Sequence, residues 1–185
     1  MRSTWMSILF ATALLPGVSA AADFQLTSQT IKHKGTIGKA HVFDGFGCTG
    51  DNVSPELRWA NAPKGTKSFA VTMYDPDAPT GSGWWHWVIF NIPSDISALA
   101  AGAGKPGGAG EPQRAVQSMT DFGEPGYGGP CPPPGHKPHR YIFTVYALKV
   151  DQFSLKPATP AAMVGFYLNQ NALAKASFTG LYSRK

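Results

Sequence analysis

Proline and glycine interrupt this chain so often that long helices have little room to form. Its 185 residues include 21 Gly and 16 Pro, residue types that favour turns and break regular elements. The runs between these breaks are rich in β-branched and aromatic side chains, which are typical of strands. The length fits one domain with one core. We therefore expect a mostly β chain, a single-domain antiparallel β-sandwich or barrel-like fold with long Gly/Pro-rich loops.

The predicted strands differ in length. Long strand candidates cover residues 68–74, 85–92 and 141–150, and shorter ones cover residues 24–27, 41–43, 57–59 and 176–182. Side chains alternate along a strand. Trp84 and His86 are therefore expected on one face of the second long strand, with Trp85 and Trp87 on the other.

One helix is predicted in the C-terminal half of the chain. Thr159 is a suitable N-cap, and Pro160 is a suitable first helical residue. The apolar residues that follow recur at helical spacing and predict a stripe packed against a sheet, formed by Met163, Phe166, Tyr167 and Ala174.

Residues 1–20 have the features of a secretory signal peptide, and residues 21–185 form the predicted mature domain. Arg2 precedes a mostly apolar stretch, and small residues allow cleavage after Ala20 or after Ala22. The apolar stretch is too short to cross a membrane, although an N-terminal anchor is the alternative interpretation. We expect a periplasmic or secreted protein without a transmembrane span.

The charge distribution does not indicate a nucleic-acid partner. The chain carries 16 Lys and Arg against 11 Asp and Glu, a net charge of +5 at pH 7. The basic residues are scattered, and only Lys32, Lys34 and Lys39 lie near one another in the sequence. A solvated face explains this pattern better than a nucleic-acid-binding patch does.

The chain has two cysteines, Cys48 and Cys131. An even count in an exported chain predicts one disulfide. Two buried free thiols are the alternative. A zinc site is less consistent with the sequence, because neither cysteine belongs to a C-x-x-C pair.

Two Pro/Gly-rich loops carry the chemistry, and each leads into a predicted strand with a histidine near its start. Residues 75–79 (Asp-Pro-Asp-Ala-Pro) precede His86, and residues 127–135 precede His139. Tyr141 shares a strand face with His139 because the two residues are two positions apart. Arg140 lies opposite and is expected to pair with a carboxylate.

Together the two segments supply carboxylates, imidazoles and loop amides, and the candidate ligand-binding residues are Asp75, Asp77, Trp84, His86, Gly129 and His139. Imidazoles and amides donate hydrogen bonds, which suits a phosphate or carboxylate. Aspartates favour a cation, so a zwitterion such as phosphoethanolamine would use both sets. Alternatively, the carboxylates hold the loop amides in place. Histidines titrate near pH ~6.5, so we expect anion binding to strengthen below that pH.

Enzymatic alternatives are weaker. Two His and two Asp are potential zinc ligands, but His86 and His139 lie far apart in the sequence. Ser82 is not part of a G-x-S-x-G motif. The prediction is therefore a non-enzymatic binding protein with no catalytic residues, cofactor or metal. A hydrolase or metal enzyme that uses the same His and Asp residues is the alternative.

These motifs resemble the phosphatidylethanolamine-binding protein family, most closely its bacterial branch, the Raf kinase inhibitor-like proteins. The resemblance runs from about Phe24 to the C-terminus. It is shared by three further segments, residues 43–48, 52–55 and 121–123.

The resemblance implies a Greek-key β-sandwich with a small anion pocket at one end, lined by residues matching Asp75, Asp77, Trp84, His86, Gly129 and His139. It implies binding of phosphate, acetate or a phosphorylated headgroup. The Cys48 and Cys131 pair is similar to exported bacterial members, whereas the eukaryotic loop is richer in Gly than residues 131–134 are. Kinase inhibition is not expected, because an exported protein does not meet a cytosolic kinase of its own cell. A protease-inhibitor-like interaction module, a protein partner and a homodimer stay open.

Overall fold

The computed structural model describes residues 22–185. The predicted signal peptide, residues 1–20, lies outside the described residues. Within residues 22–185, no helix is both long enough and apolar enough to cross a membrane.

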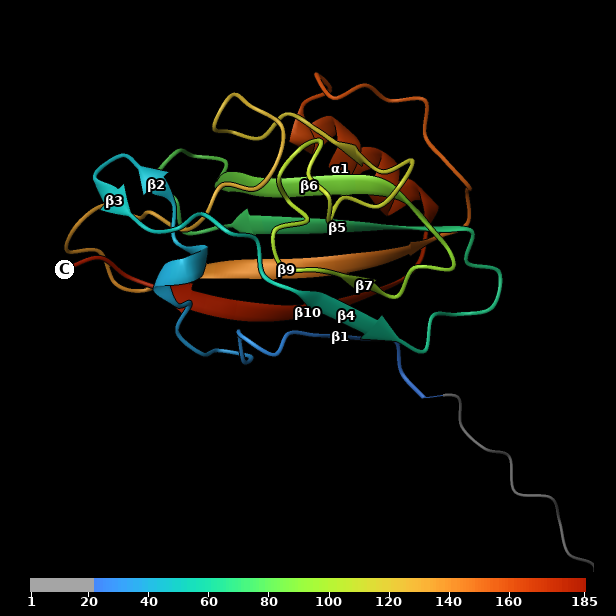
Figure 1. Ribbon diagram of the computed structural model, residues 1–185, viewed down its shortest axis with the longest axis horizontal. Helices are drawn as coiled ribbons and strands as arrows, with labels where there is room; N and C mark the ends of the chain where they lie inside the picture. Colours follow the sequence, from blue (N-terminus) through green and yellow to red (C-terminus); the bar gives the residue numbers. More distant parts are fainter. Residues whose placement is uncertain (1–21) are drawn as a thin grey trace, which may run out of the picture.

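Two antiparallel sheets form the body of the molecule (Figure 1). The larger sheet has the strand order β10–β9–β5–β6–β8, with β5 at Ser68–Asp75, β6 at Trp84–Pro93, β8 at Val116–Gln117, β9 at His139–Leu148 and β10 at Ala172–Tyr182. The smaller sheet has the order β1–β4–β7, with β1 at Gln25–Thr27, β4 at Leu57–Ala60 and β7 at Ala98–Leu99. Asp44–Gly45 (β2) and Cys48–Thr49 (β3) form a separate short pair. Strand β5 pairs with β9, although β6, β7 and β8 lie between them in the sequence, and the chain passes from one sheet to the other more than once. This connectivity gives the expected Greek-key sandwich.

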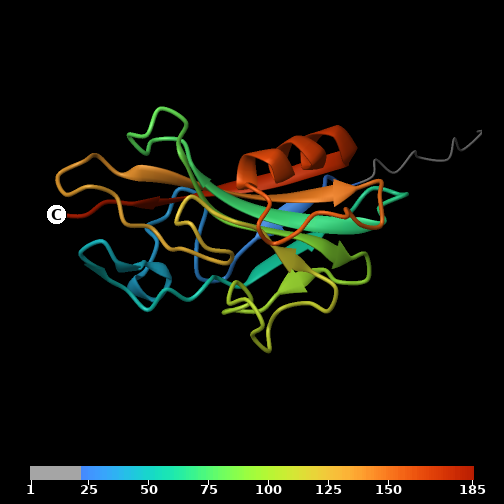
Figure 2. The ribbon, with the colours of Figure 1, turned by 90° about the horizontal axis from the view of Figure 1, so that it is seen from above.

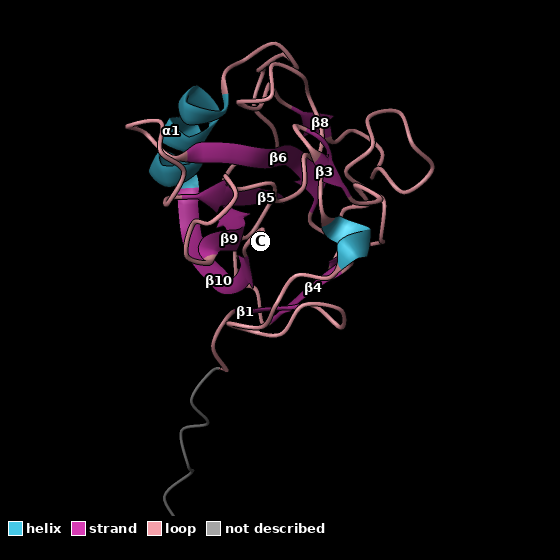
Figure 3. Ribbon diagram, turned by 90° about the vertical axis from the view of Figure 1, so that its left-hand side faces the viewer, coloured by secondary structure: helices cyan, strands magenta, loops and turns pink. Residues whose placement is uncertain are grey.

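The larger sheet is buried on both faces. Helix α1 (Ala161–Asn171) covers its outer face (Figure 2), and the smaller sheet with its loops faces the inner side (Figure 3). Strand β5 shows the consequence of alternation: Val71 and Met73 pack in the core between the sheets, and Ala70 packs in the core beneath α1. Because both faces are covered, β5 is apolar along most of its length.

The strand predictions are confirmed except for one. The three long candidates correspond to β5, β6 and β9, and β9 begins at His139, two residues earlier than predicted. The short candidates at 24–27, 57–59 and 176–182 correspond to β1, β4 and the end of β10. The strand at 41–43 is wrong, because Lys39–His41 is a 3-10 helix (η1). The following segment bonds to loops instead of a ladder: the Phe43 N–H donates to the Pro130 carbonyl, and the Phe43 carbonyl accepts from Gly50.

The helix is present, but its predicted cap and face are wrong. Pro160 occupies the N-cap, and the Thr159 hydroxyl accepts a hydrogen bond from the Lys156 N–H. The predicted stripe faces solvent, with Met163 52% and Phe166 60% exposed, and Ala174 belongs to β10. The buried side is made by smaller or branched residues, Ala161, Val164, Gly165 and Leu168.

Cys48 and Cys131 form the predicted disulfide. It joins β3 to the loop that precedes β9. Arg184, near the C-terminus, lies against this bridge, and its Nη1 donates to the Phe46 carbonyl at 2.9 Å. The disulfide therefore connects the β2–β3 pair to the loop that borders the candidate site.

Candidate anion-binding pocket

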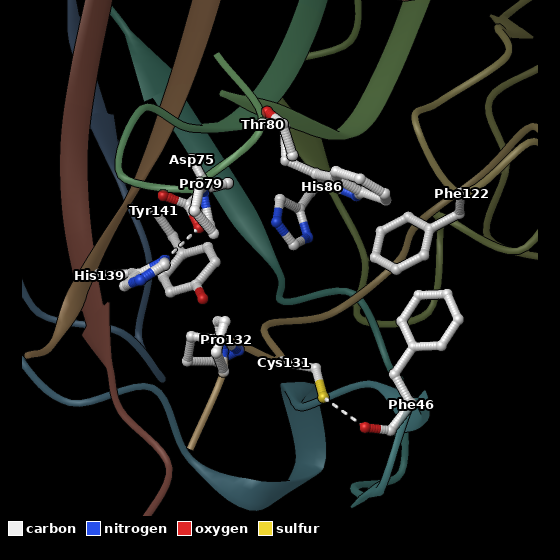
Figure 4. Close-up of a pocket in the computed structure, with 13 residues that line it drawn as sticks. Phe46, Asp75, Pro79, Thr80, His86, Phe122, Cys131, Pro132, His139 and Tyr141 are labelled. Carbon is white, nitrogen blue, oxygen red and sulfur yellow. Dashed lines mark hydrogen bonds and ion pairs between the residues drawn. The ribbon is translucent and has the colours of Figure 1, made fainter. Parts of the chain in front are cut away.

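A cavity of about 180 Å³ lies where the end of β5 meets the beginnings of β6 and β9 (Figure 4). Antiparallel pairing brings these three chain positions to one end of the sheet. The cavity is lined by Phe46, Asp75, Ala78, Pro79, Thr80, Trp84, His86, Phe122, Cys131, Pro132, Pro133, His139 and Tyr141. Four of the six predicted binding residues are in this set: Asp75, Trp84, His86 and His139.

Asp75 and His139 form a buried pair. Asp75 Oδ2 lies 2.7 Å from His139 Nδ1, and the two side chains are 3% and 2% exposed. The other carboxylate oxygen of Asp75 accepts from the Asp77 backbone N–H at 2.8 Å. His139 Nε2 lies 3.2 Å from His136 Nδ1. Both oxygens of Asp75 and both ring nitrogens of His139 are therefore engaged by the protein itself.

Asp77 does not line the cavity and pairs with Arg140 instead. Its carboxylate accepts from Arg140 Nη2 at 2.8 Å and from Arg140 Nε at 2.9 Å. It also accepts from the Arg140 backbone N–H. The side-chain hydrogen bonds of Arg140 lower the pKa of the Asp77 carboxyl to about 2, against the effect of partial burial. This pair confirms that Arg140 meets a carboxylate, and it ties the 75–79 loop to β9.

His86 is the extra residue of a β-bulge. Met73 pairs with Trp87 and Tyr74 pairs with Trp85, so no β5 residue is left opposite His86. The expectation that Trp85 and Trp87 share a face is therefore wrong: Trp85 packs under α1 and Trp87 packs between the sheets. A bulge breaks the period-2 alternation and re-aims a side chain. Here His86 and Trp84 both point into the cavity.

His86 is held by the second loop. Its Nδ1 lies 2.7 Å from the Gly128 carbonyl oxygen, and its ring meets those of Tyr141 and Phe122 edge to face. Burial lowers the pKa of His86 to about 4, even though the Gly128 carbonyl and the Asp75 carboxylate favour the charged form. The expectation of an imidazole titrating near pH ~6.5 is therefore wrong for His86, which is neutral at neutral pH.

Gly128 and Gly129, in the second loop, allow other parts of the chain to approach closely. Their backbone N–H groups already donate hydrogen bonds within the protein. A Cβ at Gly129 would lie 2.1 Å from the His41 carbonyl oxygen, and one at Gly128 would lie 2.3 Å from the Phe122 ring. The Gly129 N–H donates to Asn52 Oδ1, and the Gly128 N–H donates to the His86 carbonyl. Gly129 lies outside the cavity lining. The close approach expected of these glycines occurs, but toward other parts of the chain.

Tyr141 and Thr80 are polar lining residues that were absent from the predicted set, and Tyr141 is the one whose polar group is unpaired in the described part of the chain. It is buried and lines the cavity, and its hydroxyl has no hydrogen-bond partner within residues 22–185. Burial raises the pKa of the Tyr141 hydroxyl, so this group stays protonated and can donate. The alternation that places Tyr141 beside His139 was the signal in the sequence that could have identified it.

The mouth of the cavity is apolar, and Phe46, Phe122, Trp84 and prolines 79, 132 and 133 contribute to it. Phe46 is 68% exposed and stacks 6.0 Å from Phe122 between ring centroids. No group of three or more potential metal ligands occurs among the described residues. The fold and the cavity thus define a β-sandwich with a small end pocket that has an apolar rim and a few buried polar groups, the general form of a small-ligand site.

The chain matches a known family over nearly its whole described length. The sequence profile "Phosphatidylethanolamine-binding protein" matches residues 27–183. The chain is 52% identical over 165 residues to the UPF0098 protein YbcL of Escherichia coli (strain K12), a match that covers 89% of this chain and 90% of that protein. It is 48% identical over 159 residues to YbhB of the same strain, covering 86% and 99%. The chain belongs to the phosphatidylethanolamine-binding protein family.

Solved structures agree with this assignment. The crystal structure of E. coli YbcL, described as a new member of the mammalian PEBP family, superposes with a TM-score of 0.87 at 51% identity, covering 89% of this chain and 100% of that chain. The homologue CT736 of Chlamydia trachomatis superposes with a TM-score of 0.73 at 30% identity, covering 90% and 100%. These matches support the mostly β, antiparallel fold.

Proposed function

We propose that this protein is an exported, non-enzymatic binding protein whose pocket holds a small anionic or phosphorylated ligand. The observation that carries the proposal is the Tyr141 hydroxyl, which is buried beside the cavity without a partner in residues 22–185. Leaving a buried polar group unpaired costs about 1–3 kcal/mol. A ligand oxygen that accepts from this hydroxyl would remove the cost.

The contacts around the pocket support binding without catalysis. Cys131 is held in the disulfide, and the Thr80 hydroxyl donates to the Gly83 carbonyl. The Asp75 carboxylate and the His139 ring are engaged with each other. None of these groups is poised as a free nucleophile beside a base. Export is supported by the predicted signal peptide together with the disulfide, since disulfides persist in oxidising compartments.

The proposal predicts that Tyr141→Phe weakens ligand binding without lowering the stability of the fold. Calorimetric titration with inorganic phosphate and with O-phosphoethanolamine should show one site per wild-type chain. Loss of the hydroxyl should weaken binding by about 0.5–1.5 kcal/mol, the usual net contribution of one hydrogen bond. Urea unfolding should show stability that is unchanged or increased, because the hydroxyl has no partner to lose within the described residues.

Tyr127→Phe is the matched control. The Tyr127 hydroxyl is also buried, but it donates to the His41 carbonyl at 2.8 Å and lies outside the cavity lining. This variant should lose stability and keep its affinity. Wild-type protein that binds neither compound would contradict the proposal, and a steady heat flow after saturation would reveal turnover and contradict its non-enzymatic part.

A further inference from the structure

The tautomer of His86 follows from its surroundings. A carbonyl oxygen only accepts hydrogen bonds, so the Nδ1 that lies 2.7 Å from the Gly128 carbonyl must carry a proton. In a neutral imidazole the other ring nitrogen, Nε2, then has a lone pair and acts as an acceptor. No hydrogen bond to Nε2 is found among residues 22–185, although the Gly129 carbonyl as well as that of Gly128 favours the charged ring. The ring lines the cavity beside Tyr141 (Figure 4).

The remaining polar groups of the pocket offer few free donors. His139 uses both nitrogens on Asp75 and His136. The amides of Gly128 and Gly129 are already bonded within the protein. The groups left for a ligand include the Tyr141 hydroxyl and the Trp84 indole N–H, which can donate. His86 Nε2 is the one among them that accepts.

We infer that the pocket binds its anion together with one proton, with an acidic O–H of the ligand donating to His86 Nε2 while a second oxygen accepts from Tyr141. This inference rests on the proposed function and names the ligand class: inorganic phosphate and phosphomonoesters, in preference to phosphodiesters. A phosphomonoester monoanion has both an O–H and acceptor oxygens. A phosphodiester anion has acceptors only, so one of its oxygens would face the Nε2 lone pair.

The groups around His86 fit this arrangement. Asp75 from β5 and His139 and Tyr141 from β9 line the cavity with it. Asp121, in the loop after β8, accepts from the Trp85 N–H and acts on His86 through its charge. The two carboxylates favour a charged imidazole, but burial is the larger effect and lowers the pKa of His86 to about 4. The same carboxylates disfavour a fully deprotonated dianion. When a phosphate dianion binds, the proton is therefore taken from the solvent.

Counting protons tests the inference. At pH 8 a phosphomonoester is almost entirely dianionic, because its second pKa is about 6. Titration of O-phosphoethanolamine into the mature protein, in two buffers with different ionisation enthalpies, should show uptake of about one proton per ligand bound. The affinity should fall about tenfold per pH unit between pH 7 and 8.5, the slope for one linked proton.

Two variants locate the proton. His86→Asn removes the pocket-facing nitrogen and keeps an amide that can donate to Gly128, so proton uptake should fall to near zero. His41→Asn is the matched control. His41 Nδ1 also lies 2.7 Å from a carbonyl, that of Val53, but its Nε2 already lies 3.0 Å from the Thr30 hydroxyl. This control should keep the wild-type uptake.

The ligand class is tested with glycerophosphoethanolamine, a phosphodiester with the same amine. At pH 6 it should bind the wild type at least about tenfold more weakly than O-phosphoethanolamine does, as expected for one lost hydrogen bond to a charged group. In His86→Asn the two affinities should converge. Equal affinities in the wild type would overturn the inference.

A measurement on the wild-type protein tests the inference even where a variant fails to fold. Nitrogen NMR of the free wild-type protein at pH 7 should show His86 protonated at Nδ1 and bare at Nε2, with the Nε2 resonance shifting when phosphate saturates the site. A proton on Nε2 in the free protein, or tight binding without proton uptake, would overturn the inference and leave the proposed function standing. Failure of wild-type protein to bind either phosphate compound would overturn both.

Discussion

At the scale of single residues, Asp75 shows how a carboxylate beside a pocket can be occupied by the protein itself. One oxygen accepts from the Asp77 backbone N–H and the other from His139 Nδ1. These contacts fix the 75–79 turn and set the tautomer of His139. They favour the alternative in which the carboxylates organise the loop, rather than one in which they bind the ammonium group of a zwitterion.

Asp77 provides a test of pH-dependent stability. Its pKa is lowered to about 2 by Arg140, whereas an unfolded Asp titrates near ~3.9. A carboxyl with a lowered folded-state pKa stabilises the protein above the unfolded value, and this contribution is lost as pH falls from about 4 through about 2. The thermal midpoint of Asp77→Asn should therefore fall less than that of the wild type between pH 5 and pH 2.

Asp151→Asn is the control for this prediction. Asp151 pairs with Arg114 at 3.1 Å, but both side chains are more than half exposed, and such pairs contribute little to stability. This variant should follow the wild-type pH profile. An Asp77→Asn profile that also coincides with that of the wild type would show that the Arg140 pair does not stabilise the fold.

At the scale of elements, helix α1 shows why its buried face was mispredicted. The large apolar residue Tyr167 contacts Phe166 and Phe153 at the helix surface. The face toward the sheet contains Gly165, which lies over Trp85. The helix approaches a sheet that already carries a large ring at this position, so a small residue packs there better than a large one.

Gly165→Ala should raise the free energy of unfolding by about 0.5–1 kcal/mol, because Ala is favoured over Gly in a helix interior. The added Cβ would lie 3.4 Å from Trp85 Cη2, an ordinary contact. Gly180→Ala in β10 is the contrasting control, since its Cβ would lie 2.7 Å from Ile37 Cγ1, and it should destabilise. Urea unfolding measures both changes. Destabilisation by Gly165→Ala would show that α1 packs closer to Trp85 than this distance indicates.

At the scale of the whole molecule, the disulfide closes a long loop that contains much of the large sheet. Cys48 and Cys131 are separated by 83 positions, and both β5 and β6 lie between them. A cross-link over such a length restricts the unfolded chain strongly in the chain-entropy model. Because Cys131 also lines the pocket, the bridge holds one wall of the site in place.

Cys131→Ser should lower the free energy of unfolding by about 2–5 kcal/mol, the typical cost of losing a native disulfide. Urea unfolding of the wild type with reductant should approach that of the Cys48→Ser/Cys131→Ser double variant. Thiol titration of denatured, non-reduced protein should find no free sulfhydryl. Two titratable thiols in exported protein would contradict the bridge.

Local sequence predicted much of the fold. The apolar and β-branched runs of β5, β6 and β9 are strand-forming in themselves, and Pro and Gly mark the turns that separate them. The two segments that carry Asp75, His86 and His139 were identified together, and the structure brings all three to one cavity. The short strands β2, β3, β7 and β8 were not predicted, because two residues carry no periodic signal.

The sequence by itself determined the strand-rich class, the long strands, the disulfide-forming pair and most of the polar residues at the pocket. Only the tertiary structure decided which polar atoms are free there. The bulge at His86 depends on its pairing with β5, and the partners of Gly129 and His86 lie 77 and 42 positions away. Alternation and turn preference are local properties of a chain. Hydrogen-bond satisfaction in a buried site depends on contacts between distant segments, which form only when the chain folds.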